Sequence, residues 1–263
     1  MASSGKARRI RIGVLLAVLA GVLAYAGLDA RSRRRRNDWE ETLPVAVVLL
    51  RRGHVDEAAV GSLRRRLPAL EAKLGEELQR HRATTLRPFS FVLHGPVDVT
   101  AGAPLPEGLG AWDVVVNTYR RWRYTRAIDA AAGVGSGYAS RIYVVVKPSD
   151  GGGQLTVEGS SELNGRVGMV EVELDGGMVD FALMVVTHEL LHTLGASDKY
   201  DATGHAMVPD GLADPGRSPL YPQERVEVMA RNRPLGGGVE KPPSKLAELA
   251  VGDATAREIG WRR

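Results

Sequence analysis

The sequence predicts a mixed α/β (α+β) fold with a twisted mixed sheet, one buried helix and an irregular C-terminal part, preceded by an N-terminal apolar helix. Short apolar runs alternate with helix-like patterns between residues 43 and 174. Residues 178–194 have a helical pattern that is apolar around nearly its whole circumference, and residues 196–243 are rich in Gly, Pro and Asp with little periodicity. We therefore expect a targeting segment over residues 1–36 and one folded domain over residues 37–263.

Composition and charge narrow the class of protein. The 263 residues are 44% hydrophobic and 25% charged, which fits a globular chain and excludes a mainly disordered, collagen-like or polytopic membrane protein. The formal charge of +4 misleads, because residues 1–36 hold nine Lys and Arg against one acid and leave 26 basic against 30 acidic residues in the rest. An acidic body gives no reason to expect nucleic acid as a partner. The chain has no Cys, so any bound metal must be held by His, Asp or Glu.

Residues 12–28 form an uncharged apolar run of 17 residues with basic residues on both sides. A helix of about 17–25 such residues spans a bilayer, so the run predicts a membrane-targeting segment. One interpretation is a signal peptide cleaved after Ala26, which would release a secreted protein. We favour the other, a retained single-pass anchor, because the Arg cluster just beyond the cleavage site opposes translocation. Both flanks are positive, so the charges do not fix the orientation of the anchor.

The body reads as alternating strands and helices. The continuous apolar run over residues 44–50 predicts a strand covered on both faces. Pro68 predicts a break or kink in the helix that its neighbours favour, because it cannot donate the interior hydrogen bond. The remaining elements are helices over 56–82, 111–132 and 244–259 and strands over 89–93 and 141–146.

Residues 167–174 predict an edge strand. Apolar residues alternate there with Glu171 and Glu173, which gives one dry and one wet face. Charged outer positions also discourage unwanted pairing at an exposed edge.

The helix over residues 178–194 carries the chemistry of the chain. His188, Glu189 and His192 lie within five residues of an otherwise apolar segment. Burying three ionisable groups is costly unless a partner compensates their lost hydration. Residues four apart share one helical face, so both imidazoles can bind a single metal ion, while Glu189 lies about 100° round the helix beside it. There Glu189 could take a proton from a metal-bound water.

A catalytic zinc site normally has three protein ligands and one open position. Gly195 follows His192 by three residues and can adopt the left-handed conformation that ends a helix and turns the chain back. Asp198 then lies six residues after His192 and is the expected third ligand. Three other residues remain as alternatives for that position, namely Asp201, His205 and Glu224.

The pattern His-Glu-x-x-His-x-x-Gly-x-x-Asp, from His188 to Asp198, resembles the metzincin superfamily of zinc endopeptidases, and within it the snapalysin-like variants in which Asp replaces a third His. The resemblance implies that His188, His192 and Asp198 bind zinc and that Glu189 is the general base. The sequence match to these families is strong over about ten residues. In the rest of the chain only the order of helices and strands agrees.

The resemblance also implies a Met-containing turn beneath the metal. Met229 is the better candidate and Met207 the alternative. Metzincins often have Tyr two residues after that Met, where this chain has Arg231, so Tyr200 and Tyr221 are left as candidates for the residue that steadies a developing oxyanion.

These observations predict a membrane-tethered zinc metallopeptidase that acts on a protein or peptide substrate, docked by strand addition to residues 167–174. One alternative is a catalytically silent, zinc-stabilised binding module, and another is a gluzincin-type peptidase with Glu224 as third ligand on a second helix. The segment 119–126 interleaves aromatic and Arg residues. We expect there an amphipathic helix that packs Trp122 on the body, in preference to a patch that faces nucleic acid or lipid.

Overall fold

The computed structural model describes residues 3–100, 108, 110–148, 158–161 and 165–262. It divides into two compact units, Met1–Asp38 and Trp39–Arg263. The first unit holds the helix α1 (Ser3–Arg36), in which the segment Arg11–Arg36 contains an 18-residue window with a mean hydropathy of 2.1 and is long and apolar enough to cross a membrane. A retained anchor and a signal sequence share this property, so the choice between them stays a prediction.

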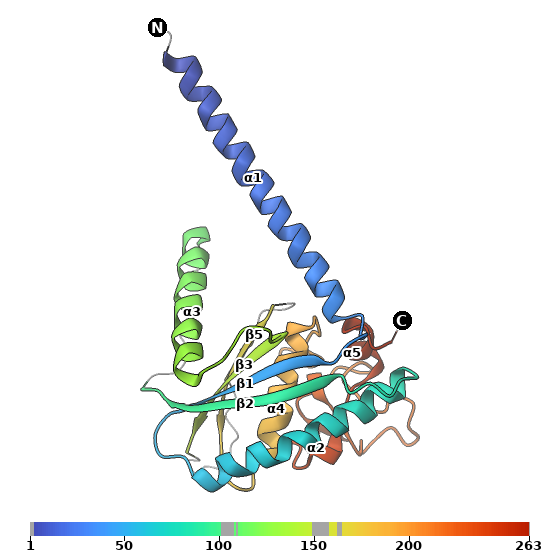
Figure 1. The fold of residues 1–263 in the computed structure, drawn as a ribbon. Helices are drawn as coiled ribbons and strands as arrows, with labels where there is room; N and C mark the ends of the chain where they lie inside the picture. Colours follow the sequence, from blue (N-terminus) through green and yellow to red (C-terminus); the bar gives the residue numbers. More distant parts are fainter. Residues whose placement is uncertain (1–2, 101–107, 109, 149–157, 162–164, 263) are drawn as a thin grey trace. The chain divides into compact units, whose positions relative to one another are not determined.

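The second unit is a mixed α/β domain built on a five-stranded sheet of order β2-β1-β3-β5-β4 (Figure 1). The strands β2, β1, β3 and β5 are parallel, and β4 runs antiparallel to β5. The helices α2 and α4 lie on one side of the sheet and α3 on the other (Figure 1). The bounds are β1 Leu43–Arg51, α2 Glu57–His81, β2 Phe89–Asp98, α3 Ala111–Ala132, β3 Ser140–Lys147, β4 Glu158–Ser161, β5 Val167–Glu173 and α4 Val179–Thr193.

The centre of the sheet is dry on both faces. Residues 45–50 of β1 are all fully buried, as the unbroken apolar run predicted. Val45, Val47 and Leu49 pack toward α2 and α4, whereas Ala46, Val48 and Leu50 pack toward the C-terminal turns of α3.

The predicted break at Pro68 is wrong, because α2 continues through this residue. Pro68 lies on the exposed side of the helix, where water can satisfy the carbonyl that loses its partner. Leu67 and Leu70 are buried beside it and hold both halves of the helix on the sheet.

The prediction that residues 167–174 form the edge of the sheet is also wrong. The strand β5 is interior, paired with β3 on one side and with the short edge strand β4 on the other. The alternating pattern predicted that Glu171 faces solvent. Its carboxylate instead pairs with Arg52 at 2.6 Å and with Lys147 at 3.8 Å, so two cations from other segments balance its charge.

The C-terminal part winds through short elements. The predicted helix over 244–259 forms only in its second half, as α5 (Asp253–Glu258). Just before α5, the backbone N–H of Val251 donates to Glu77 and that of Gly252 donates to Glu227. These side-chain carboxylates take the place of the carbonyl acceptors that a longer helix would supply. The other elements are β6 Val226–Glu227, the 3-10 turns Val228–Ala230 and Leu246–Glu248, β7 Arg233–Gly236, β8 Val239–Lys241 and β9 Leu249–Ala250.

Candidate metal centre

The helix α4 carries ionisable side chains into the core. His188 is 9% exposed and Glu189 is 4% exposed, on a helix whose other faces pack on the sheet and on α2. The Nδ1 atom of His188 lies 3.0 Å from the carbonyl oxygen of Val228, and that of His192 lies 2.8 Å from the carbonyl of Ala196. A carbonyl oxygen can only accept, so both imidazoles donate through Nδ1 and leave the Nε2 lone pair free.

These two Nε2 lone pairs meet a carboxylate oxygen at one point. The Nε2 atoms are 3.1 Å apart, and Oδ1 of Asp198 lies 3.3 Å from that of His188 and 3.2 Å from that of His192. Asp198 Oδ1 is buried and has no hydrogen-bond donor within the described part of the chain. Three acceptors that face one another can hold a cation between them.

The separations and the donor types fit zinc. Ligands about 2.0–2.3 Å from a tetrahedral metal stand about 3.3–3.7 Å from one another, and the three distances here are at or just below that range. Within the described residues, His188, His192 and Asp198 are the one group of three or more His and acidic residues close enough to share a metal. Two neutral imidazoles and a carboxylate also leave a fourth position for water.

Electrostatics point the same way. Burial acts to lower the pKa of His192, but the Asp198 carboxylate and the Ala196 carbonyl outweigh it and raise that pKa above its ordinary value. Burial acts in the opposite sense on Asp198, yet the two histidines hold the pKa of this carboxyl well below its ordinary value. The site therefore favours a positive charge at the point where the three side chains meet.

The neighbouring carboxylate of Glu189 is held by the edge strand β4. Its Oε2 accepts a short hydrogen bond from the hydroxyl of Ser161. A Cβ at position 159 would overlap Glu189 Oε1, so a larger residue there would displace this carboxylate. The sequence did not predict a role for Gly159 or Ser161. The sequence indicates them only as two small residues two positions apart, so that they share one face of a strand, in a segment without an apolar alternation.

The candidate third ligand, Asp198, is held in place through its two neighbours in the chain. The backbone N–H of Ser197 donates to Glu258 at 3.0 Å, and the ammonium of Lys199 lies 2.8 Å from each carboxylate oxygen of Glu258. Burial acts to raise the pKa of Glu258, but the Lys199 ammonium outweighs it and keeps that pKa below its ordinary value. The helix α5 thus holds the segment that presents Asp198.

The other residues singled out in the sequence lie around this centre. Gly195 follows α4 with φ of 102°, in the left-handed region that favours glycine. Met229 is fully buried in the turn Val228–Ala230, and its carbonyl accepts from the N–H of Lys199 at 2.9 Å. The alternative, Met207, is 39% exposed.

Tyr200 lies at the centre as well. Its ring stacks near His188, with centroids 6.4 Å apart, and the guanidinium of Arg231 lies 5.2 Å above the Tyr200 ring. Burial raises the pKa of Tyr200, and the charge of Asp198 adds to that effect. Tyr221 instead packs against Gly236 of β7.

The alternative third ligands have other partners. Asp201 accepts from the backbone N–H groups of Thr203 and His205 and so organises its own turn. His205 lies 3.7 Å from Glu240. Glu224 pairs with Arg217 at 2.8 Å in an irregular segment, where the gluzincin alternative requires a helix.

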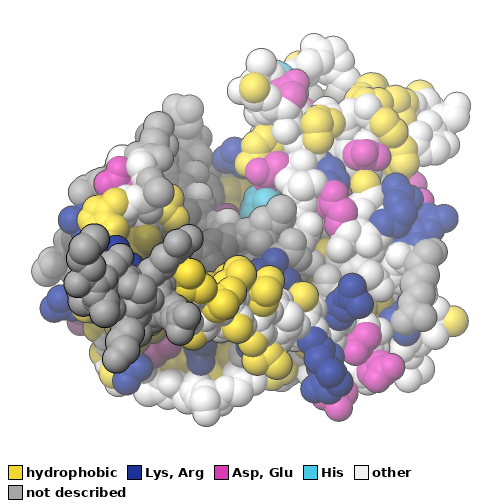
Figure 2. Space-filling view, turned by 90° about the horizontal axis from the view of Figure 1, so that it is seen from above, with side chains coloured by type: hydrophobic (Ala, Val, Ile, Leu, Met, Phe, Trp, Pro, Cys, Tyr) yellow, Lys and Arg dark blue, Asp and Glu magenta, His cyan; other side chains and the backbone are white. Residues whose placement is uncertain are grey.

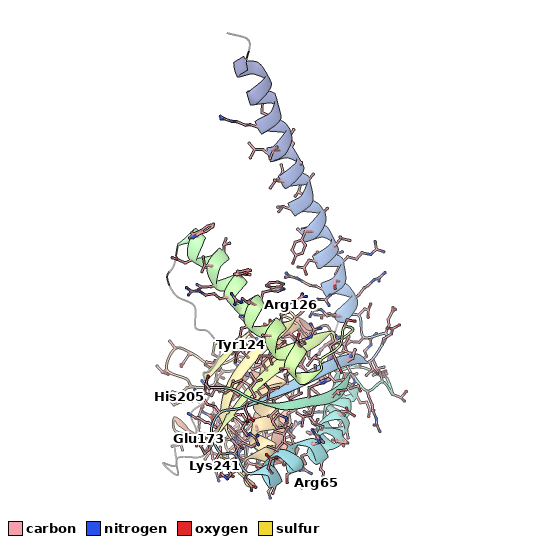
Figure 3. All side chains as sticks on the ribbon, turned by 60° about the vertical axis from the view of Figure 1, so that its left-hand side comes forward. Arg65, Tyr124, Arg126, Glu173, His205 and Lys241 are labelled. Carbon is pink, nitrogen blue, oxygen red and sulfur yellow. The ribbon has the colours of Figure 1, made fainter. Side chains whose placement is uncertain are left out.

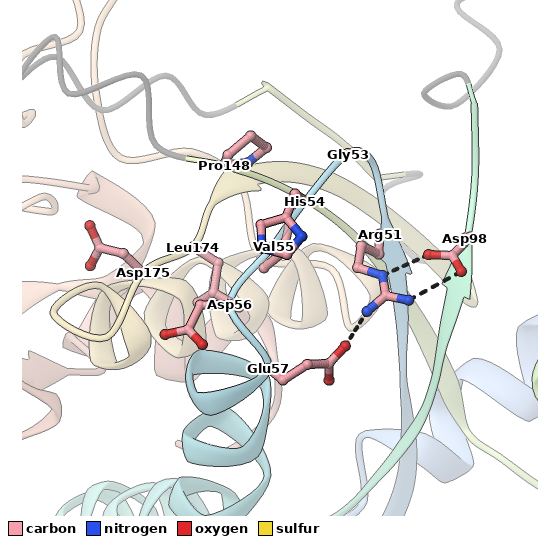
Figure 4. A pocket seen from close by; sticks show the side chains of 10 residues that line it. All are labelled: Arg51, Gly53, His54, Val55, Asp56, Glu57, Asp98, Pro148, Leu174 and Asp175. Atoms are coloured by element: carbon pink, nitrogen blue, oxygen red, sulfur yellow. Dashed lines mark hydrogen bonds and ion pairs between the residues drawn. The ribbon is translucent and has the colours of Figure 1, made fainter.

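A separate open pocket of about 850 Å³ lies at the carboxyl ends of β1, β2 and β5 (Figure 4). It carries none of the predicted site residues. Arg51, the one Lys or Arg side chain among the described residues that line it, is held by Asp98 at 2.6 Å and by Glu57. We find no reaction chemistry in that arrangement.

No protein-family model matches the chain, and no curated protein matches its sequence. The fold is similar to that of solved structures, among them the crystal structure of archaemetzincin from Methanopyrus kandleri. That match has a TM-score of 0.35 and 15% sequence identity and covers 74% of this chain and 89% of the other.

Proposed function

We propose that this chain is a zinc-dependent peptidase of metzincin type, with the snapalysin-like ligand set of two His and one Asp, and that α1 anchors it in a membrane. The observation that carries the proposal is the convergence of His188, His192 and Asp198 as three acceptors without a donor, beside a carboxylate that is not one of them. A purely structural zinc site closes all four positions and has no use for such a neighbour.

The chain's own residues have distinct roles in this reaction. Bound zinc would polarise a peptide carbonyl and acidify a water. Glu189 accepts the proton of the attacking water and passes it to the departing amine, as a general base and then a general acid. Ser161 donates to one oxygen of that carboxylate and so orients it. Tyr200, beside His188, is the better placed candidate to steady the oxyanion.

The edge strand β4 supports a peptide as the substrate. One side of β4 pairs with β5, and its residues Gly159 and Ser161 lie against Glu189. An extended peptide added to its other side would pass the general base, with affinity that comes mainly from main-chain hydrogen bonds. We therefore expect broad side-chain preference.

Metal analysis together with a casein proteolysis assay on the full chain tests the proposal. We expect one zinc per chain and protease activity in the unmodified protein. Glu189→Gln should retain zinc and lose about 10²–10⁴-fold in kcat/KM, because general base catalysis contributes about that much. Glu171→Gln, which alters a carboxylate on β5 paired with Arg52, is the matched control and should remain active.

Two outcomes would contradict the proposal. If the unmodified chain binds zinc without proteolytic activity, the silent binding module is the better interpretation. If His192→Ala binds zinc as tightly as the unmodified chain, the metal is held elsewhere.

A further inference from the structure

The helix α3 exposes an apolar stripe that the peptidase chemistry does not use. Trp112 is 74% exposed, Val115 54%, Tyr119 57% and Trp122 53%. Their spacing of three, four and three residues places them on one side of the helix, along about 15 Å. The prediction that Trp122 packs on the body is therefore wrong.

The geometry of α3 explains this exposure. Of its described side chains, Thr125 and Ile128 are buried, and both belong to the C-terminal half. Tyr124 packs against the second core cluster, whereas Arg126, two residues on, is exposed on another side of the helix (Figure 3). Figure 1 shows one end of α3 at the sheet and the other standing clear of it. The stripe is thus presented outward by the half of the helix that the sheet does not cover.

Basic side chains continue the stripe. The guanidinium of Arg126 lies 5.5 Å above the ring of Trp122, whose centroid is 5.9 Å from that of Tyr119. Arg123 is exposed and lies next to the stripe by helical position. Trp, Tyr and Arg are the residues that sit at the boundary between lipid headgroups and acyl chains, because each has an apolar body and a polar end.

We propose that the stripe Trp112, Val115, Tyr119 and Trp122 docks into the surface of an anionic bilayer, with Arg123 and Arg126 against lipid phosphates. The proposal rests on α1 being retained in that bilayer, as argued above. Residues 37–42 are the only link between α1 and β1, and six residues reach at most about 20 Å. The body is thus kept at the membrane surface, where even a weakly binding helix meets lipid at high effective concentration.

Two other occupants fit the stripe less well. A second copy would bring the Arg side chains of two stripes together, which is unfavourable. Nucleic acid would meet a body with excess acidic charge, and on the face that Figure 2 shows Lys and Arg side chains are interspersed with Asp and Glu. The aromatic and basic composition of a single helix face suits an anionic lipid surface best.

The tryptophans of the chain make a direct test possible. Trp39 is 4% exposed and Trp261 is 1% exposed, so Trp112 and Trp122 dominate any quenching from outside. We would reconstitute the full chain in vesicles of phosphatidylcholine and phosphatidylglycerol with brominated acyl chains and measure Trp fluorescence. Quenching is expected in the unmodified chain and in either single Trp→Phe variant, and it should be lost in Trp112→Phe/Trp122→Phe. Arg123→Gln/Arg126→Gln should weaken it more in anionic than in pure phosphatidylcholine vesicles.

A matched control uses Val239, which is 58% exposed on β8 of the same body. In the double Phe background, Val239→Trp should be quenched by acrylamide in the water and not by brominated lipid. The proposal is overturned if only acrylamide quenches the fluorescence of Trp112 and Trp122, because both side chains then face water. It is also overturned if neither quencher acts on them, because they then contact protein. Protection from acrylamide by an added oligonucleotide, with no lipid quenching, would overturn it in favour of nucleic acid. Flotation of the chain with vesicles tests α1 separately, and zinc and protease assays are independent of both.

Discussion

The helices α3 and α4 break the usual rule of apolar inside and polar outside in opposite directions. In α4, His188 and Glu189 are buried among core residues. In α3, Trp112 and Trp122 are more than half exposed. Each departure is unfavourable for the chain alone, and under the two proposals a partner of matching chemistry compensates it, a divalent cation for α4 and a lipid surface for α3. The contrast shows that the side chains least suited to their surroundings point to what a protein binds.

The largest expected effect is a difference in stability between substitutions in α4 and in α3. Leu183 of α4 is fully buried, so Leu183→Ala should lower the free energy of unfolding by about 2–5 kcal/mol. Val115 of α3 is 54% exposed, so Val115→Ala should change it by less than about 0.5 kcal/mol. Urea denaturation of both variants measures the difference. Equal destabilisation would mean that the α3 stripe packs on protein.

A smaller effect is expected from the contact between α5 and the third ligand. Glu258→Gln should lower zinc affinity about 10–100-fold, because the segment around Asp198 loses the partner of Lys199 and Ser197. Chelator competition measures the affinity, and the visible spectrum of the Co²⁺-substituted protein reports whether the carboxylate still binds.

Glu248→Gln is the control, since in the described part of the chain the Glu248 side chain accepts hydrogen bonds locally, from Ser244. If Glu258→Gln lowers Tm but leaves affinity and spectrum unchanged, Glu258 serves stability alone. If all three readouts are unchanged, it has neither role.

The smallest effect concerns the N-terminal turn of α4, where Asp180 accepts from Arg66 at 2.7 and 2.9 Å. The hydrogen bond from Arg66 is the main reason that the pKa of Asp180 lies below its ordinary value of 3.8. A depressed pKa stabilises the fold above the unfolded value, and this contribution is lost as pH falls through the lower folded value.

We therefore expect Asp180→Asn to lose about 1 kcal/mol or less at pH 7 and to converge with the unmodified chain in strong acid. Denaturation between pH 2 and pH 7 measures this. A constant difference across that range would indicate that packing, not charge, is responsible.

Strong local patterns predicted much of the fold. The bounds of α3 and the dry central strand β1 followed from periodicity, and the His188 and His192 spacing gave one helical face. The structure brings Asp198 to the same point, although the identity of the metal and the reaction stay proposals.

The misses around the sheet and the site have one cause, because they depend on contacts between distant segments. The local pattern predicts that Glu171 faces solvent, whereas in the fold Arg52 and Lys147 lie beside its carboxylate. Ser161 reaches Glu189 across 28 residues, and Glu258 reaches Lys199 across 59, with no local signal at either end. Side chains that orient a site are thus harder to predict from sequence than His188 and His192, whose spacing is set by one helix.

The contact between Glu258 and the residues flanking Asp198 has a consequence during synthesis. All three ligands are translated before residue 199, whereas Glu258 follows Asp198 by 60 positions. At about 5–20 residues per second, a growing chain passes about 3–12 s with its ligands made and their support still missing. Under the proposed function, we expect tight zinc capture to wait for that later segment.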